Sequence, residues 1–218
     1  MMSKLIRTVG RGGNAGSLYF DGDDDFLEYN IDITMNDSFT INLYSKMVND
    51  NPLIFRNIIS TGGNYQLGFA LEEGRLLIYD RTDLAAKVII FSRTNEWTFF
   101  TIINNAINKN IDLYIDGEKR GELTYKSISS NYNNLTSGIR FGASNIYTRM
   151  NLACVSYYSR ILHPNEIKIL SQGLPISRVG LVGEWKMNEM DGNIAYDTSG
   201  NGNHATIYGA NYTTDKPY

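Results

Sequence analysis

The chain is poor in the residues that most often mark catalysis or covalent cross-linking. Its 218 residues include one cysteine, Cys154, and two histidines, His163 and His204. A single cysteine excludes an internal disulfide framework. It lies in an apolar strand-like stretch, LACVSYY, where a cysteine behaves as a small apolar residue. Both histidines lie beside turn signals, so we expect them at surface turns rather than in a catalytic group.

Basic charge and long apolar runs are also scarce. The chain has 20 Lys and Arg against 23 Asp and Glu, a net charge of −3, which gives no basic surface for nucleic acid. No stretch is apolar enough for a membrane helix. The opening stretch, MMSKLIRTVGRGGNAG, lacks the apolar segment of a signal peptide. The sequence therefore predicts neither nucleic-acid binding nor membrane insertion, and no export by the secretory route.

Tyrosine, by contrast, is abundant, with 15 residues against 2 Trp and 9 Phe. Aromatic residues favour strands, and a tyrosine ring with its polar tip also suits sugar stacking and interfaces. Short strand-like runs separated by turn signals recur along the chain, which is typical of a sandwich or barrel. The expected strands cover residues 17–22, 25–30, 38–48, 58–63, 65–80, 87–92, 96–105, 110–125, 139–144, 150–161, 181–187 and 205–208.

Three local patterns sharpen this prediction. Residues 38–48 alternate apolar with polar, which predicts a strand buried on one face. Glu73-Gly74 and Asp116-Gly117 predict two-residue hairpin turns. HPNEIKILSQG predicts one short helix, with Pro164 at its first position and Gly173 just beyond its end, covering one end of the sandwich.

The C-terminal stretch GLVGEWKMNEMDGNIAYDTSGNGNHATIYGA, residues 180–210, is the most informative segment. It resembles the opening strands of the laminin-G-like, concanavalin A-like jelly-roll domains. SLYFDGDDDFLEY, DSFTINLYSK, EWTFFTIIN with IDLYIDGEKRG, IRFGAS and YYSRILHPNEI resemble successive later segments of that family. The resemblance extends from Ser17 to Tyr212. It implies a two-sheet antiparallel jelly-roll sandwich with one short helix, formed by residues 17–218 after an N-terminal arm of residues 1–16.

In the family the SGNGNH-type segment comes first, whereas here it comes last. The chain therefore resembles a circular permutant with new ends at Met1 and Tyr218. Alternatively, the segment completes a neighbouring subunit by strand exchange, which would give a homo-oligomer. Both interpretations make residues 180–212 part of the core, with Leu181 and Trp185 facing inward.

Catalysis is not expected. Some concanavalin A-like folds are glycosidases, which need two carboxylates on one strand face. The nearest pair is Glu189 and Asp191, where a third acid is missing and Gly192 breaks the strand. Asp112 and Asp116 lie around a hairpin. The sequence has no histidine placed to activate a nucleophile and no phosphate-binding loop.

The FDGDDDF segment offers a candidate calcium site. Closely spaced carboxylates repel one another unless they are solvated or bridged by a cation, and calcium takes oxygen ligands from such loops. The candidate ligands are Asp21, Asp23, Asp24, Asp25, Asp197 and Asn201. The alternative is a solvated acidic turn without an ion.

Loop residues with aromatic and amide side chains are candidates for sugar binding. They are Asn64, Tyr65, Tyr132, Asn133, Asn145 and Tyr147, with Tyr208 and Tyr212 in the tail. The alternative is that these loops are polar only because loops are. The acidic pair common in the family's late strand is missing, since NLACVS stands there.

Two functions fit these observations. One is a virion surface protein, in a phage tail fibre, baseplate or capsid decoration, that contacts glycans or neighbouring structural subunits. Such a protein would reach the exterior on lysis. The other is a free, calcium-dependent carbohydrate-binding lectin module.

Overall fold

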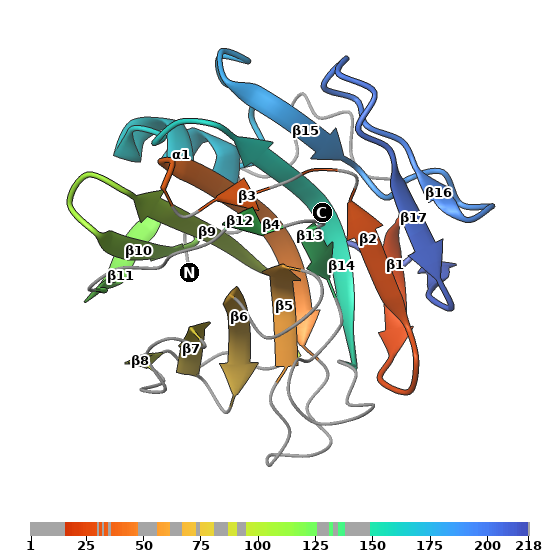
Figure 1. Ribbon diagram of the computed structural model, residues 1–218. Coiled ribbons are helices and arrows are strands. Elements are labelled where there is room, and N and C mark those ends of the chain that lie inside the picture. The colour runs from red at the N-terminus through yellow and green to blue at the C-terminus, as the bar shows by residue number, and fades with distance from the viewer. Residues whose placement is uncertain are drawn as a thin grey trace, which may run out of the picture.

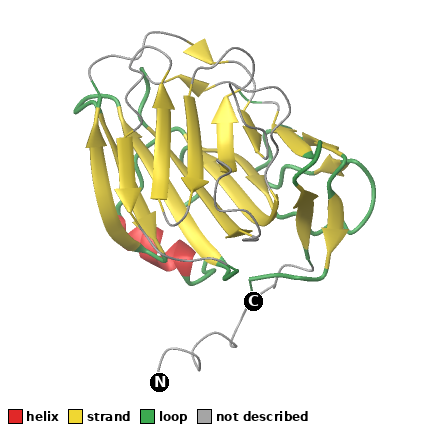
Figure 2. Cartoon of the chain, turned by 90° about the horizontal axis from the view of Figure 1, so that it is seen from below, coloured by secondary structure: helices red, strands yellow, loops and turns green. Residues whose placement is uncertain are grey.

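Two antiparallel β-sheets face each other in the computed structural model, and a short helix lies outside one of them (Figures 1 and 2). The structure describes residues 16–29, 31, 33–34, 36–47, 95–125 and 149–217, together with the backbone of strands β5 to β8, β12 and β13. This arrangement confirms the predicted two-sheet jelly-roll sandwich. The expected strand at 139–144 lies outside the described residues.

The first sheet has its longest strand near the middle. Its order is β11 (Glu118–Thr124), β10 (Asn110–Ile115), β9 (Thr98–Asn105), β4 (Phe39–Met47), β14 (Arg149–Tyr158), β1 (Ser17–Asp21) and β18 (Asn211–Thr213), with β15 (Leu181–Trp185) also paired to β14. One edge of β14 is lined by β4. The other edge is shared, by β1 near its start and by β15 near its end.

The second sheet joins strands from both ends of the chain. Its order is β16 (Ile194–Ala195), β17 (Ala205–Tyr208), β2 (Phe26–Tyr29), β13 (Leu135–Ser137), β5 (Arg56–Thr61), β6 (Leu67–Glu72), β7 (Arg75–Asp80) and β8 (Lys87–Ile90). A separate pair is formed by β3 (Ile33–Thr34) and β12 (Asn131–Tyr132).

The hairpin predictions hold wherever the turn is described. Asp116 and Gly117 join β10 to β11 with φ of 50° and 86°, the left-handed pair that an Asp-Gly hairpin turn requires. The Asp116 carboxylate accepts a hydrogen bond from the Phe99 N–H at 3.0 Å, which ties the turn to β9. The ladder between β6 and β7 closes at Glu72 and Arg75, as a two-residue loop requires, and its turn residues lie outside the described part.

The helix α1 (Pro164–Ser171) begins as predicted but lies elsewhere than expected. His163 is its N-cap, and its Nδ1 accepts a hydrogen bond from the Asn165 N–H. Glu166 completes a capping box by accepting the His163 N–H. The helix covers the outer face of the first sheet rather than one end of the sandwich, and there Ile167 is fully buried.

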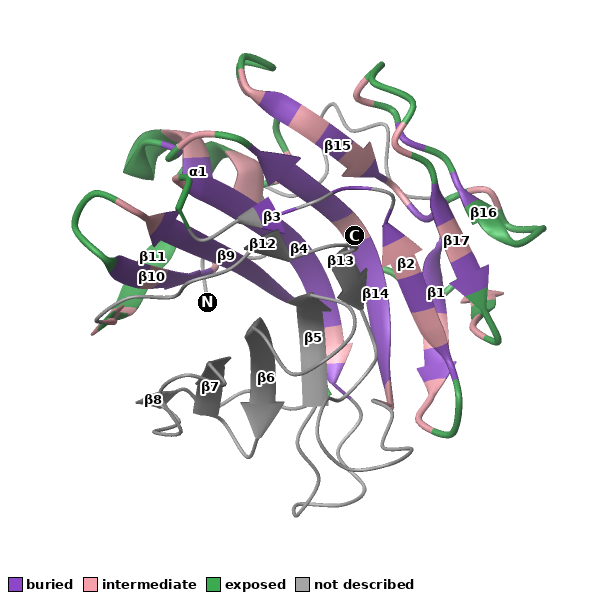
Figure 3. Ribbon diagram, viewed as in Figure 1, coloured by how far each residue is buried: buried purple, intermediate pink, exposed green. Residues whose placement is uncertain are grey.

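This helix explains why the prediction for residues 38–48 was wrong. Phe39, Ile41 and Leu43 face the main core, as expected. The alternate side chains Thr40, Asn42 and Tyr44 are buried as well, and Lys46 near the end of β4 is half-buried (Figure 3). Tyr44, the clearest case, packs in a second apolar cluster beneath α1. Its hydroxyl donates to the Ser171 carbonyl at the helix end. The alternation therefore separates two cores rather than a core from solvent.

Trp185 faces the main core, as predicted, and is fully buried. Its ring meets Tyr29 of the opposite sheet edge-on at 4.5 Å, and its Nε1 donates to the Asn203 carbonyl at 2.7 Å. Leu181 is buried too, but in the outer cluster, so its expected direction was wrong. The reason is an irregularity in the β14–β15 ladder between Tyr157 and Tyr158, which turns the two ends of β15 to opposite faces.

The C-terminal segment pairs with strands of its own chain. Its strands β15, β17 and β18 add to β14, β2 and β1. Beyond β18, Asp215 forms an ion pair with Lys46 of β4 and accepts a hydrogen bond from Trp97 Nε1 at 3.0 Å. Circular permutation and strand exchange between subunits both stay predictions. Among the described residues no helix is both long and apolar enough to span a membrane.

Gly183 provides a direct test of this packing. A Cβ added there would lie 2.2 Å from Cη2 of Trp185, so Gly183→Ala must displace the indole ring. We expect a loss of about 1–3 kcal/mol in the free energy of unfolding, typical of an overpacked core. Urea unfolding measures the loss, and near-ultraviolet circular dichroism reports the displaced ring.

Gly202→Ala is the matched control. Nothing lies within 4 Å of a Cβ at Gly202, although its φ of +77° strains an alanine. This control should lose stability through its backbone alone and keep the tryptophan signal. An unchanged tryptophan signal in Gly183→Ala would contradict the packing described.

Candidate functional site

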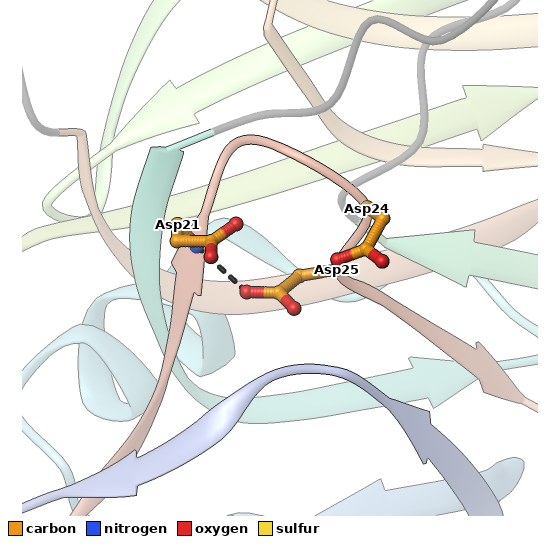
Figure 4. A group of neighbouring side chains, drawn as sticks. All are labelled: Asp21, Asp24 and Asp25. Carbon is orange, nitrogen blue, oxygen red and sulfur yellow. Dashed lines mark hydrogen bonds between the residues drawn. The ribbon is translucent and has the colours of Figure 1, made fainter.

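The turn between β1 and β2 gathers three carboxylates (Figure 4). One oxygen from each of Asp21, Asp24 and Asp25 lies within 4.8 Å of the others. Asp25 Oδ2 accepts the Asp21 N–H at 2.7 Å, and Asp21 Oδ1 accepts the Asp23 N–H at 2.8 Å. The turn therefore folds its acids toward one another by bonding two of them to its own backbone.

Asp25 is the buried member of this group, with 2% of its surface exposed. Burial raises the pKa of its carboxyl above the ordinary value. The Asp21 N–H bond lowers this pKa, and the negative charges of Asp21 and Asp24 raise it again. Folding therefore makes the charged form of Asp25 less favourable than it is in the unfolded chain, and a cation in the turn would relieve that cost.

The turn suits a cation only in part. Calcium takes six to eight oxygen ligands, and three carboxylates can supply some of them. The Asp21 carbonyl, however, already accepts a hydrogen bond from Arg149 Nε at 2.8 Å, which brings a positive charge to the same turn. Asp23 is exposed and lies outside the cluster of three. Calcium at this turn stays a prediction.

Asp197, another candidate ligand, organises its own loop. Its Oδ1 accepts the N–H groups of Glu184 and Ser199, at 2.9 and 2.8 Å. Its Oδ2 accepts the Ser199 hydroxyl and the Asn203 N–H, at 2.7 and 3.0 Å. His204 Nδ1 accepts the Asp197 N–H. These bonds order the glycine-rich loop through the protein's own groups.

Asn201 serves the same loop rather than the acidic turn. Its Nδ2 donates to the carbonyls of Leu181 and Val182, both at 3.0 Å, which fastens the loop to β15. Of the six candidate calcium ligands, the structure thus brings three together in the β1–β2 turn. It places Asp197 and Asn201 in a separate hydrogen-bonded loop.

Burial raises the pKa of Asp197, but the hydrogen bonds from Glu184, Ser199 and Asn203 outweigh that effect and leave the pKa below its ordinary value. The bonds therefore favour the charged carboxylate.

The structure does not describe the side chains of the six residues that the sequence predicted for sugar binding. Asn64, Tyr65, Asn133, Asn145 and Tyr147 lie outside the described residues. Tyr132 is described only in its backbone, which pairs with Ile33. These six positions stay predictions.

A pair of stacked aromatic rings adjoins the acidic turn. The ring of Tyr208, 42% exposed, stacks on Phe26 with 4.2 Å between centroids and 12° between planes. The next residue, Gly209, abuts Asp25, where an added Cβ would lie 2.1 Å from Oδ1. Sequence reasoning noticed Tyr208 but missed Phe26. Alternation in FLEY and ATIY signals that each ring faces away from the core.

The acids considered for catalysis have structural partners. Glu189 accepts the Tyr196 N–H at 2.9 Å with one oxygen and the Tyr212 hydroxyl at 3.0 Å with the other. Asp112 pairs with Lys119 at 3.0 Å. Asp191 accepts its neighbour's N–H in an exposed turn.

Comparison with known families decides the classification. Residues 20–168 match the family model of the concanavalin A-like lectin/glucanases superfamily. The chain belongs to this superfamily. The match ends before β15, so the C-terminal strands complete the superfamily fold from outside the matched range. The fold is that of a lectin-like binding domain. No match was found among curated proteins.

Solved structures show the same fold at low identity. A candidate carbohydrate-binding protein from Bacteroides ovatus is 14% identical with a TM-score of 0.70, over 92% of this chain and 60% of that one. The binding domain of botulinum neurotoxin serotype D is 20% identical with a TM-score of 0.57, over 72% and 42%. A heptameric SAP-like pentraxin from Limulus polyphemus is 11% identical with a TM-score of 0.54, over 72% and 82%. The chain thus covers less than two thirds of the length of the first two of these structures.

The hydrogen bonds that Asp197 accepts predict that its carboxylate stabilises the folded domain. We expect Asp197→Ala to lower the free energy of unfolding at pH 7 by about 2–4 kcal/mol, since buried N–H donors lose a charged acceptor. The folded pKa lies below the unfolded value, which is about 3.9. The contribution is therefore complete above the unfolded pKa and is lost as pH falls through the folded pKa.

Urea unfolding of both proteins from neutral pH into acid measures this dependence. The gap between wild type and Asp197→Ala should narrow in acid. Asp197→Asn, which keeps one acceptor oxygen, should fall between them at pH 7. A gap that stays constant across the series would contradict the role of the charged carboxylate.

Proposed function

We propose that this chain is a non-catalytic glycan-binding domain. Its lectin-like fold supports this, and the observation that carries it is the exposed Tyr208 ring stacked on Phe26 beside the acidic turn. A flat apolar ring with a polar tip suits the apolar face and hydroxyl edge of a sugar. Phe26 holds the Tyr208 ring in place, so little side-chain freedom is lost on binding.

The partners of the acidic residues support the absence of catalysis. Glycoside hydrolysis needs one carboxyl group as acid and a second as nucleophile or base, both facing the substrate. Both Glu189 oxygens accept hydrogen bonds from the protein's own Tyr196 N–H and Tyr212 hydroxyl. Asp112 is held by Lys119. These residues stabilise turns and strands, which leaves binding as the function that the site supports best.

A glycan array probed with the purified chain, followed by calorimetry on the best ligand, tests the proposal. We expect binding to at least one class of glycan and no release of reducing ends on prolonged incubation. Repeating the calorimetry in calcium and in chelator tests the acidic turn, since a cation among Asp21, Asp24 and Asp25 would couple ion and sugar binding. Hydrolysis, or no binding across the array, would overturn the proposal.

We further propose that the domain acts at a virion surface, in contact with neighbouring structural subunits, and is released from the cell on lysis. The resemblance to laminin-G-like domains of phage structural proteins supports this role. So do four exposed apolar side chains on and around α1, which suit contact with a neighbouring subunit: Ile161, Ile169, Leu174 and Val179. Val179 is 72% exposed.

Deletion of residues 1–11 tests this second role. Lys4, Arg7 and Arg11 are spaced through a glycine-rich N-terminal segment, and basic residues at that spacing suit docking on a neighbouring subunit. We expect the shortened chain to keep its circular dichroism and melting temperature and to lose higher-order assembly in light scattering. An unchanged oligomer, or a chain that is monomeric before deletion, would count against it.

A further inference from the structure

On the outer face of the second sheet, side chains from strands β16, β17 and β2 line up in rows across the strands. Strand β17 pairs with β16 on one side and with β2 on the other, which brings Ile194, Thr206 and Glu28 into one row and Tyr208 and Phe26 into the next. The intervening residues of these strands, Ala195, Ala205, Ile207, Leu27 and Tyr29, are buried in the main core. The row members therefore point away from the core, as the alternating colours of β17 show (Figure 3).

Aromatic rings lie at both ends of this surface, which we call the β17 face. At one end Tyr208 stacks on Phe26. At the other, Tyr196 is 52% exposed and meets the ring of His204 edge-on, with 5.2 Å between centroids. His204 immediately precedes β17 and Tyr208 ends it, so the two ring pairs are about 13 Å apart at the strand rise per residue.

The space between the ring pairs is mixed in character. Ile194, 38% exposed, offers an apolar side chain, and Thr206 beside it offers a hydroxyl. A sheet surface that repeats ring, hydroxyl and ring differs from the continuous apolar core of a tight protein interface. It matches an extended sugar chain, in which apolar ring faces alternate with hydroxyl groups.

The charged residues on and beside the β17 face limit the class of ligand that it can bind. Strands β2, β16 and β17 contain a single charged residue, Glu28. The turns beside the face add Asp23, Asp24 and Asp191, all exposed, and these acids outweigh the Arg149 guanidinium that lies at the β1–β2 turn. Phosphate, sulfate, sialic acid and uronic acid groups would meet negative charge here, which disfavours them.

We propose that the β17 face binds an extended, uncharged oligosaccharide that stacks on Tyr208 at one end and on Tyr196 at the other. This inference rests on the proposed glycan-binding function and adds the place of binding and the class of sugar. Tyr208 was among the sugar-binding candidates taken from the sequence, whereas Tyr196 was not. Phe26 and His204 act as positioning residues, because each contacts the ring that meets the sugar.

Chain-length dependence tests the proposal. The probes are β-1,4-linked oligomers of glucose, mannose and N-acetylglucosamine, as mono-, tri- and hexasaccharides, with a sialylated oligosaccharide for comparison. Calorimetry is run on the full chain and on Tyr196→Ala, Tyr208→Ala and the double variant. Ile107→Ala, at the 87% exposed tip of the β9–β10 turn, is the matched surface control. Tyr208→Phe tests whether the ring is sufficient.

We expect one neutral series to bind more tightly as its length increases. Each alanine variant should weaken binding of the hexasaccharide about fivefold to tenfold, while Tyr208→Phe and Ile107→Ala change it little. The double variant should lose the dependence on length. Melting curves should match wild type, because both tyrosines are substantially exposed.

Other outcomes separate this inference from the proposed function. Glycan binding that neither tyrosine variant weakens, or a preference for the sialylated probe, would overturn the β17 face and leave a glycan-binding domain. Failure of the wild-type chain to bind any glycan would overturn both. A change of mass in light scattering with the variants, without any effect on sugar binding, would assign the face to a protein contact and overturn the inference.

Discussion

The fold depends on how β14 shares one of its edges. β1 pairs with its first half, and β15, more than 150 residues later in the sequence, pairs with its second half. The two halves of β14 are separated by an irregularity in the ladder between β14 and β4. Cys154 lies at this irregularity and has a φ of 47°. Such a bulge bends a strand and increases its twist. A single long strand therefore holds the beginning and the end of the described chain in one sheet.

Two side chains hold the C-terminal segment in place once β15 is paired with β14. β15 places Trp185 in the main core, and the carbonyl of Asn203 accepts its indole N–H. Asp197 then gathers backbone N–H groups from both ends of the loop around it. The loop is thus held by one buried indole and one charged carboxylate. Its many glycines allow the turns, while these two side chains select one arrangement.

Local sequence signals predicted the turns and the helix start, because a few neighbouring residues determine these features. Asp116-Gly117 gave the hairpin and Pro164 the helix start, because turn and cap chemistry act over a few residues. Predictions failed where a distant element decides the environment. The polar face of β4 is buried because α1 covers it, and Leu181 faces the outer cluster because a bulge intervenes. The Phe26–Tyr208 stack joins strands from opposite ends of the sequence, so only strand register could reveal it.

The surface that we assign to sugar binding is fixed by the core behind it. Along β17, Ala205 and Ile207 pack inward while Thr206 and Tyr208 face outward. A slip of one residue in register would exchange these sets, burying a tyrosine hydroxyl and exposing the apolar pair. The same slip would separate Tyr208 from Phe26. Because the core penalises that slip, the stack is held in register without a dedicated loop, and the binding surface and the sandwich form as one structure.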